Sequence, residues 1–399
     1  NLRSHDAQRG EAAMKKNLLS PFLAILPDVG LCLFAYGLLR YGREASESLR
    51  QGLSLCAQVL IPSLFPFFVF SEMMVRTGAA AKCGRLLEKP VKVLFRLPGV
   101  CAPVFALGLL GGYPVGAKTA CALYEQKLCS REETQRLLAF CNNCGPAFTL
   151  GVAGLAVFHS LQAGLLLWGC HVLASLCTGL LFRFYGSSSP RRLSPVSSEK
   201  AMPFSHALVE SVTSAMSSLL NVCAFVLFFG LCIGLLEQMG ITGVLLSLLK
   251  RLGVSRDFAA PILSGSLEMT TGIWGLSEVA GALPLRLSAA AFLLAFGGLS
   301  VHFQSLSFLT SSGLSAAPYF MGKITHGALS ALFTYIAALR LPPQTAAASG
   351  LFFQASPSSL SPLSIFLFSS LLCLILWLLT GLRRGKWGKN HCHSPRKPV

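Results

Sequence analysis

Two stretches of the sequence resemble each other, and each carries helix-breaking residues inside an apolar segment. The first is Gly111-Gly112-Tyr113-Pro114-Val115-Gly116, followed by Leu138-Ala139-Phe140-Cys141-Asn142-Asn143-Cys144-Gly145-Pro146. The second is Ser264-Gly265-Ser266-Leu267-Glu268-Met269-Thr270-Thr271-Gly272, followed by Leu294-Ala295-Phe296-Gly297-Gly298-Leu299-Ser300. A helix broken in hydrocarbon frees backbone N–H and C=O groups, which cost several kcal/mol if they stay unsatisfied. Paired interrupted segments in two halves of a chain indicate a transporter binding site.

The composition is that of a membrane protein with several spans. Of the 399 residues, 53% are hydrophobic and only 12% are charged, whereas soluble domains carry about 25% charged residues. The net charge of +17 does not indicate nucleic-acid binding, because Lys and Arg flank apolar segments and form no patch interleaved with aromatic residues. Cytoplasmic loops of membrane proteins are rich in positive charge. We therefore expect this chain to lie in the lipid bilayer and to bind no nucleic acid.

Apolar length predicts an all-α integral membrane fold of about eight spanning helices with two re-entrant hairpins in two inverted repeats. The candidate spans are 17–40, 50–75, 137–158, 161–183, 207–237, 288–310, 318–340 and 362–382. The stretches 99–116 and 259–275 are shorter and Gly-rich, which is typical of re-entrant hairpins. Ser130 and Glu133 have the spacing of a capping box that opens the helix leading into 137–158. Met14-Lys15-Lys16, just before the first apolar segment, resembles the natural N-terminus of a protein. We therefore interpret residues 1–13 as translated sequence upstream of the natural start codon.

Charge predicts the orientation of these spans. The tail after Leu382 is basic and contains no acid, so both termini are expected in the cytoplasm. The basic loop 76–96 and the linker 186–204 then also lie inside, and the uncharged segment 341–361 lies outside. The loop that carries Lys250, Arg251 and Arg256 does not fit this map. We interpret that loop as an interfacial amphipathic segment.

The same map divides the chain into parts. An N-terminal tail and first span occupy 1–45, a first repeat 46–185, a Ser/Pro-rich cytoplasmic linker 186–206, a second repeat 207–340, and a loop, last span and basic tail 341–399. Each repeat holds three candidate spans and one hairpin. Because that number of spans is odd, the second repeat is expected to be inverted relative to the first. Inverted repeats place the binding site at their shared axis, near the midplane of the bilayer.

The candidate substrate-binding residues lie at the two hairpin tips and the two breaks. Polar groups inside a membrane are rare and often functional. Asn142 and Asn143 offer hydrogen-bond donors and acceptors, Glu268 could hold a cation or a proton with Lys118 as its counter-charge, and His302 could titrate near neutral pH. The full set is Gly111, Gly112, Tyr113, Pro114, Gly116, Lys118, Asn142, Asn143, Gly145, Glu268, Thr270, Thr271, Gly298, Ser300, His302 and Gln304.

Each of these residues also has a purely structural interpretation. The glycines allow close helix packing, and the asparagines form hydrogen bonds between helices. Glu268 could sit in a structural ion pair, Lys118 could extend to the interface, and His302 could be a packed core residue. Cys141 and Cys144 have metal-ligand spacing but supply too few ligands for structural zinc. We expect no cofactor, and the chain lacks both a P-loop motif and a nucleophile–base–acid set typical of an enzyme.

At these residues the chain resembles the sporulation integral membrane protein family of YlbJ type. The resemblance covers roughly 45–340 and rests on Gly112-Tyr113-Pro114-x-Gly116-Ala117-Lys118, the Leu-Ala-Phe-Cys-Asn-Asn-x-Gly-Pro motif at 138–146, Glu268-Met-Thr-Thr-Gly272 and the segment 297–304. Members carry a nucleoside recognition, or gate, domain similar to concentrative nucleoside transporters. The resemblance implies two hairpins and two unwound helices around one substrate. It also implies movement of dipicolinate from the mother cell across the outer forespore membrane. Glu268 indicates a coupling ion or proton as a further partner, because a carboxylate at the site would repel a bare dianion.

Three functions remain open from the sequence. The chain could be a secondary transporter of a small polar or anionic solute, a non-transporting membrane scaffold for spore envelope (cortex) assembly, or a membrane enzyme or lipid flippase. A central polar cavity lined by both repeats favours the first function. A tightly packed axis, with Asn142 and Glu268 bonded only to each other or to helices, favours the second. A cavity that opens sideways to lipid favours the third.

Overall fold

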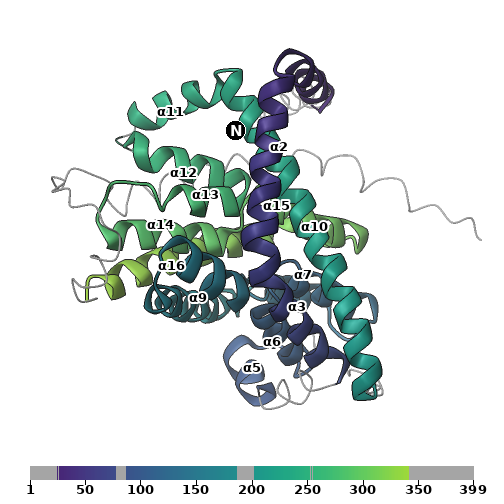
Figure 1. Ribbon diagram of the computed structural model, residues 1–399. Helices are drawn as coiled ribbons and strands as arrows, with labels where there is room; N and C mark the ends of the chain where they lie inside the picture. Colours follow the sequence, from purple (N-terminus) through teal and green to yellow (C-terminus); the bar gives the residue numbers. More distant parts are fainter. Residues whose placement is uncertain are drawn as a thin grey trace, which may run out of the picture.

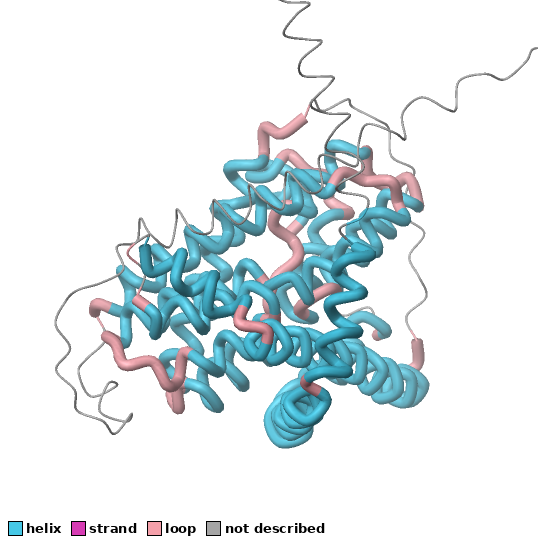
Figure 2. The backbone as a smooth tube through the Cα atoms, turned by 90° about the horizontal axis from the view of Figure 1, so that it is seen from above, coloured by secondary structure: helices cyan, strands magenta, loops and turns pink. Residues whose placement is uncertain are grey.

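The computed structural model describes residues 25, 27–77, 87–186, 202–251, 253 and 255–340. Within these ranges the chain forms helices and turns but no strand (Figures 1 and 2). Four described helical stretches are long and apolar enough to cross a membrane, namely Gly42–Met74, Leu161–Phe182, Phe204–Gln238 and Leu283–Ser311. They confirm the long apolar helices predicted at 50–75, 161–183, 207–237 and 288–310. The predicted span 362–382, the loop 341–361, the basic tail and residues 1–13 lie outside the described residues, and 17–40 is described only in part.

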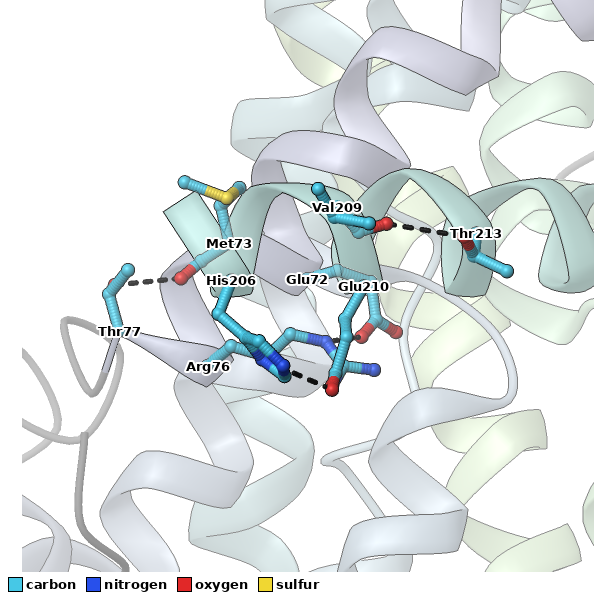
Figure 3. Close-up of polar contacts among 8 residues, drawn as sticks. All are labelled: Glu72, Met73, Arg76, Thr77, His206, Val209, Glu210 and Thr213. Carbon is cyan, nitrogen blue, oxygen red and sulfur yellow. Dashed lines mark hydrogen bonds and ion pairs between the residues drawn. The ribbon is translucent and has the colours of Figure 1, made fainter. Parts of the chain in front are cut away.

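Two long helical rods lie against each other along one side of the molecule (Figure 1). The first consists of α2 (Gly42–Leu55), the π-helical turn η1 (Cys56–Leu60) and α3 (Ile61–Arg76), and the second is α10 (Phe204–Gln238). Polar contacts join the end of α3 to the start of α10, as Figure 3 shows. The Arg76 guanidinium pairs with Glu210 and, at 3.4 Å, with Glu72. The loop that follows α3 therefore starts on the same side of the molecule on which the linker before α10 ends. The charge map also places this loop and this linker on one side of the membrane.

Both predicted hairpins are pairs of helices separated by a short turn. After α5 (Glu88–Phe95), the first hairpin consists of α6 (Cys101–Gly111) and α7 (Val115–Glu125). The second consists of α12 (Arg256–Leu267) and α13 (Met269–Gly275). The first hairpin continues beyond the predicted end at 116, because no Gly or Pro interrupts the helix after its first turn. Glycine lets the arms of the second hairpin touch: a Cβ on Gly272 would lie 2.1 Å from the Cα of Gly265.

The two segments that follow the hairpins are broken helices. In the first half, α8 (Arg131–Leu138) is followed by the non-helical residues 139–145 and then by the π-helix η2 (Ala147–Val157). In the second half, α14 (Leu283–Phe296) is followed by α15 (Gly298–Ser311) across a left-handed Gly297 with φ 90°. The repeated Leu-Ala-Phe motif marks the end of a helix in both halves. The predicted capping box at Ser130 and Glu133 is present at the start of α8.

The core lies around α14, which packs on α16 (Ala316–Ala338), and α16 in turn packs on α9 (Leu161–Phe182). Ten residues of α14 are buried, from Leu287 to Phe296. The outward faces of α9 and α10 expose large apolar side chains, such as Leu173 at 50% and Phe228 at 50% of their surface. Apolar surface of this extent is typical of a protein that contacts lipid.

The order of elements is the same in both halves of the chain. Each half has a long helix, then a hairpin, then a broken helix and then a second long helix.

The short helix α11 (Ile241–Arg251) holds two of the three basic residues that do not fit the charge map, and the third, Arg256, begins α12. Its last turn carries Lys250 and Arg251. Val244 and Leu248, one turn apart, are exposed on the same helix, whereas Leu246 and Leu249 are buried. A helix with exposed apolar side chains and a basic end is typical of an interfacial segment. The interfacial position of this loop stays a prediction.

Candidate functional site

A pocket lies where the two hairpin tips meet the two helix breaks. The empty space between its lining residues, counted together with the open solvent at its mouth, is about 620 Å³. The first half contributes its tip and break, and the second half contributes its own tip and break. These lining residues are Leu110, Gly111, Gly112, Tyr113, Cys144 and Gly145 from the first half, and Glu268, Met269, Thr270, Ser300, Val301 and Gln304 from the second.

The first tip lies directly on the first break because glycine occupies both sides of the contact. Gly112 has φ 73° and ψ −169°, a backbone conformation that is essentially restricted to glycine. A Cβ on Gly145 would lie 3.2 Å from the backbone N and Cα of Gly112. Gly116 packs against the same break, since its Cβ would lie 2.1 Å from the Cys141 carbonyl oxygen. Gly116 and Pro114 therefore shape the tip without lining the pocket.

The second tip is organised by Glu268, which is 3% exposed and caps the start of α13. Its carboxylate accepts the backbone N–H of Thr270 at 3.0 Å and that of Thr271 at 2.7 Å. The Thr271 hydroxyl donates a further hydrogen bond at 2.9 Å. Among the described residues no Lys, Arg or His forms an ion pair with Glu268. Hydrogen bonds from its own tip, rather than a basic side chain, stabilise this carboxylate.

The second break packs against the second tip as closely as the first pair does. Gly298 has φ 68°, and a Cβ there would lie 2.9 Å from the Gly265 carbonyl oxygen. Gly298 therefore allows contact with the tip but does not line the pocket. Ser300 and Gln304 follow on α15 at a spacing of one helical turn, and both line it.

The remaining wall of the pocket is apolar and comes from three other elements. Leu64 and Phe68 lie on α3, Val222, Phe225 and Val226 lie on α10, and Ala147 and Phe148 lie on η2. Ligand pockets are typically of this kind, with an apolar wall and a few polar groups that orient the ligand. Sequence reasoning missed these walls, because no polar residue or helix break marks the positions on α3 and α10.

Asn142 and Asn143 lie behind the pocket rather than in its wall. The Asn142 carboxamide oxygen accepts the N–H of Ala117 at 3.3 Å, and its nitrogen donates to the Ser305 hydroxyl at 2.9 Å. The Asn143 nitrogen donates to the Phe140 carbonyl at 2.9 Å. Asn142 thus links the first hairpin and α15 to the first break. These contacts fit the structural interpretation of the two residues, as hydrogen-bond links between segments.

Lys118 and His302 also stay outside the pocket. The Lys118 side chain is exposed, on the face of α7 opposite the buried Ala117 and Ala120. The proposed Lys118–Glu268 pairing is absent for this reason. His302 is buried, with its Nδ1 atom 3.1 Å from the Tyr319 hydroxyl and its ring edge-on to Phe296. His302 is thus a packed, hydrogen-bonded core residue in this structure.

The basic residue beside the site is Lys323 on α16, which sequence reasoning missed. It is 1% exposed, and its ammonium donates to the Tyr113 hydroxyl at 2.6 Å and to the Asn142 carbonyl at 3.0 Å. The Tyr113 hydroxyl in turn lies 2.9 Å from the Leu294 carbonyl and 3.1 Å from the Ala295 carbonyl. The available signal was a lysine inside the apolar segment 318–340, since charged residues within a span are rare and often functional.

Comparisons with known proteins agree with this architecture. A family model described as Gate, nucleoside recognition, matches residues 57–159. The sporulation integral membrane protein YlbJ of Bacillus subtilis (strain 168) is 32% identical over 314 residues, which cover 73% of this chain and 76% of that protein. A structure of CNTnw in an inward-facing substrate-bound state, 14% identical, has a TM-score of 0.52 over 80% of this chain and 86% of that chain.

These similarities define the fold and the family. The fold is similar to that of a concentrative nucleoside transporter, and the long apolar helices are those of an integral membrane protein. The identity to the Bacillus subtilis protein extends well beyond the gate segment and covers most of both chains. The chain therefore belongs to the family of sporulation integral membrane proteins of YlbJ type.

Proposed function

We propose that this protein is a secondary transporter that moves a small anionic solute, dipicolinate, across the outer forespore membrane during sporulation, and that it is not an enzyme. One observation carries the proposal: two hairpin tips and two helix breaks from different halves of the chain line a single pocket. A pocket at the junction of two moving bodies can open to either side when one body rocks against the other. A sporulation membrane protein among the relatives supports the setting.

The chemistry of the pocket supports a small planar solute. Phe68, Phe148 and Phe225 lie in the wall, and aromatic side chains stack on flat rings. Thr270, Ser300 and Gln304 lie in the same wall and bring donors that could bind carboxylate oxygens. Dipicolinate combines a flat aromatic ring with two carboxylates, so it matches both parts of this lining.

Glu268 sets a condition on the transported species. Glu268 lines the pocket, and its carboxylate has no ion-pair partner among the described residues, so it would repel a bare dianion bound at close range. A proton or a cation that accompanies dipicolinate would relieve this repulsion. We therefore propose that transport is coupled to a proton or a cation, with Glu268 as the group that senses it.

A substitution that fills the pocket separates a transporter from a scaffold. Val222 lines the pocket from α10, and Val209 on the same helix is 67% exposed and points away from the core. Spores whose only copy carries Val222→Trp should lack dipicolinate although the protein is present in the membrane. Spores with the matched control Val209→Trp should accumulate it normally. Normal dipicolinate in Val222→Trp spores would reject transport through this pocket and favour the scaffold for envelope assembly.

A further inference from the structure

The Lys323 ammonium is a buried charge that the proposed transport step does not use. It is 1% exposed, and no carboxylate of the described residues lies within 4.0 Å of it. An isolated buried ammonium is strongly disfavoured unless other groups replace the water that it loses. In this chain the replacing groups are oxygen atoms and one aromatic face. The Tyr113 ring lies under the ammonium, with its centroid 4.4 Å from Nζ.

Two oxygen atoms accept from the ammonium, one from the first break and one from the first hairpin tip, and the second of these connects it to the end of α14. The Asn142 carbonyl belongs to the first break and accepts directly from Lys323 at 3.0 Å. The Tyr113 hydroxyl, 2.6 Å from the ammonium, lies within hydrogen-bond distance of the Leu294 and Ala295 carbonyls in the last turn of α14. The carbonyls at the C-terminal end of a half-helix carry partial negative charge. Unwound carbonyls and half-helix ends of this kind coordinate cations in transporters with broken helices.

We propose that Lys323 is a built-in cation that takes the place of a dissociable metal ion at this junction. Its ammonium holds the first hairpin tip, through Tyr113, against both helix breaks at once. Because the charge is covalently attached to α16, closure of this tip needs no Na⁺. The inference rests on the proposed function only in one respect, namely that closure of the tip is a step of transport. The oxygen site itself is independent of the solute.

Two substitutions at position 323 separate a cation site from simple packing. Lys323→Ala removes the charge and leaves space beside the oxygens, which a small cation can then fill. Lys323→Met removes the charge and fills most of the same space with an uncharged chain. If the oxygens form a cation site, Na⁺ or methylammonium should stabilise the Ala variant and not the Met variant. If Lys323 only packs, both variants should lose stability and neither should respond to cations.

The experiment is thermal unfolding of the purified full chain in detergent, with Na⁺ replaced by choline at equal ionic strength, and with methylammonium compared with tetramethylammonium. All variants are compared in a Glu268→Gln background, which removes the proposed coupling carboxylate. With Lys323 or Lys323→Arg in that background, the melting temperature should be the same in Na⁺ and choline. For Lys323→Ala, Na⁺ or methylammonium should raise it saturably, by about 2 °C or more. A Na⁺-dependent rise in Glu268→Gln protein that keeps Lys323 overturns the inference even if no variant at position 323 folds. A folded Lys323→Ala protein without any cation response overturns it as well.

Uptake of dipicolinate by proteoliposomes keeps the two proposals apart. If the melting pattern is as expected but the wild-type protein takes up no dipicolinate, the built-in cation is supported and the proposed function is rejected. If the wild-type protein takes up dipicolinate but folded Lys323→Ala protein shows no cation response in its melting, the proposed function survives and the built-in cation is overturned.

Discussion

Replacing Gly112 by alanine should weaken dipicolinate binding without preventing folding. At φ 73° and ψ −169°, the residue occupies a backbone region in which any side chain costs about 1–3 kcal/mol. A Cβ would also lie 3.2 Å from the backbone N of Gly145, a contact that crowds the tip against the break. The strain falls on the tip in its docked position. About 2 kcal/mol corresponds to a factor of about 30 in an equilibrium constant, so we expect an affinity about 30-fold lower.

Titration calorimetry of the purified protein with dipicolinate measures this loss directly. The matched control is Gly169→Ala on α9, where no atom lies within 4 Å of the added Cβ. An alanine inside a helix is favoured over glycine by about 1 kcal/mol, so the control should bind as the wild-type protein does and should not melt earlier. An affinity of folded Gly112→Ala protein within threefold of the wild-type value would refute the reasoning that the docked tip forms the site.

Further substitutions test other contacts of the same site. Glu268→Gln places an amide NH₂ against the backbone N–H groups of Thr270 and Thr271. The loss of a charge-assisted hydrogen bond should lower the free energy of unfolding by about 1.5–3 kcal/mol. We expect a lower melting temperature and at least tenfold slower uptake of dipicolinate. Asn142→Ala leaves the buried N–H of Ala117 without its acceptor and should lower the free energy of unfolding by about 1–3 kcal/mol, measured by thermal unfolding; an unchanged melting temperature would contradict this role. Lys118 is exposed, so Lys118→Ala should change neither uptake nor melting, and a large loss of uptake would restore the pairing with Glu268 that the structure lacks.

The positions of the tips and breaks could be predicted from the sequence because they depend on local chemistry. Gly111-Gly112 and Gly297-Gly298 interrupt apolar segments that are otherwise helical, and such interruptions are visible without knowledge of the fold. The repeated Leu-Ala-Phe motif showed that the two breaks correspond. The inference that the freed backbone groups gather around one cavity follows from their cost in hydrocarbon. The pocket lined by both tips and both breaks has this arrangement.

The partners of individual polar side chains could not be predicted, because they depend on which face of a helix meets a distant segment. Lys118 follows the first tip by one turn, and a small rotation of α7 decides whether it faces the pocket or the outside. Lys323 is 210 residues away from its partner Tyr113 in the sequence, and no local pattern joins them. The apolar walls from α3 and α10 were missed for a related reason, since any apolar residue of a span has the same signature whether it faces lipid or a pocket.

The most direct test of the central claim is counterflow of labelled dipicolinate into proteoliposomes that contain only this protein. We predict saturable uptake by the wild-type protein and by Val209→Trp, and uptake at the level of protein-free liposomes for Val222→Trp, whose added ring fills the pocket between the tips. Uptake by the wild-type protein that does not exceed that of protein-free liposomes, with correctly folded and inserted protein, would contradict the account.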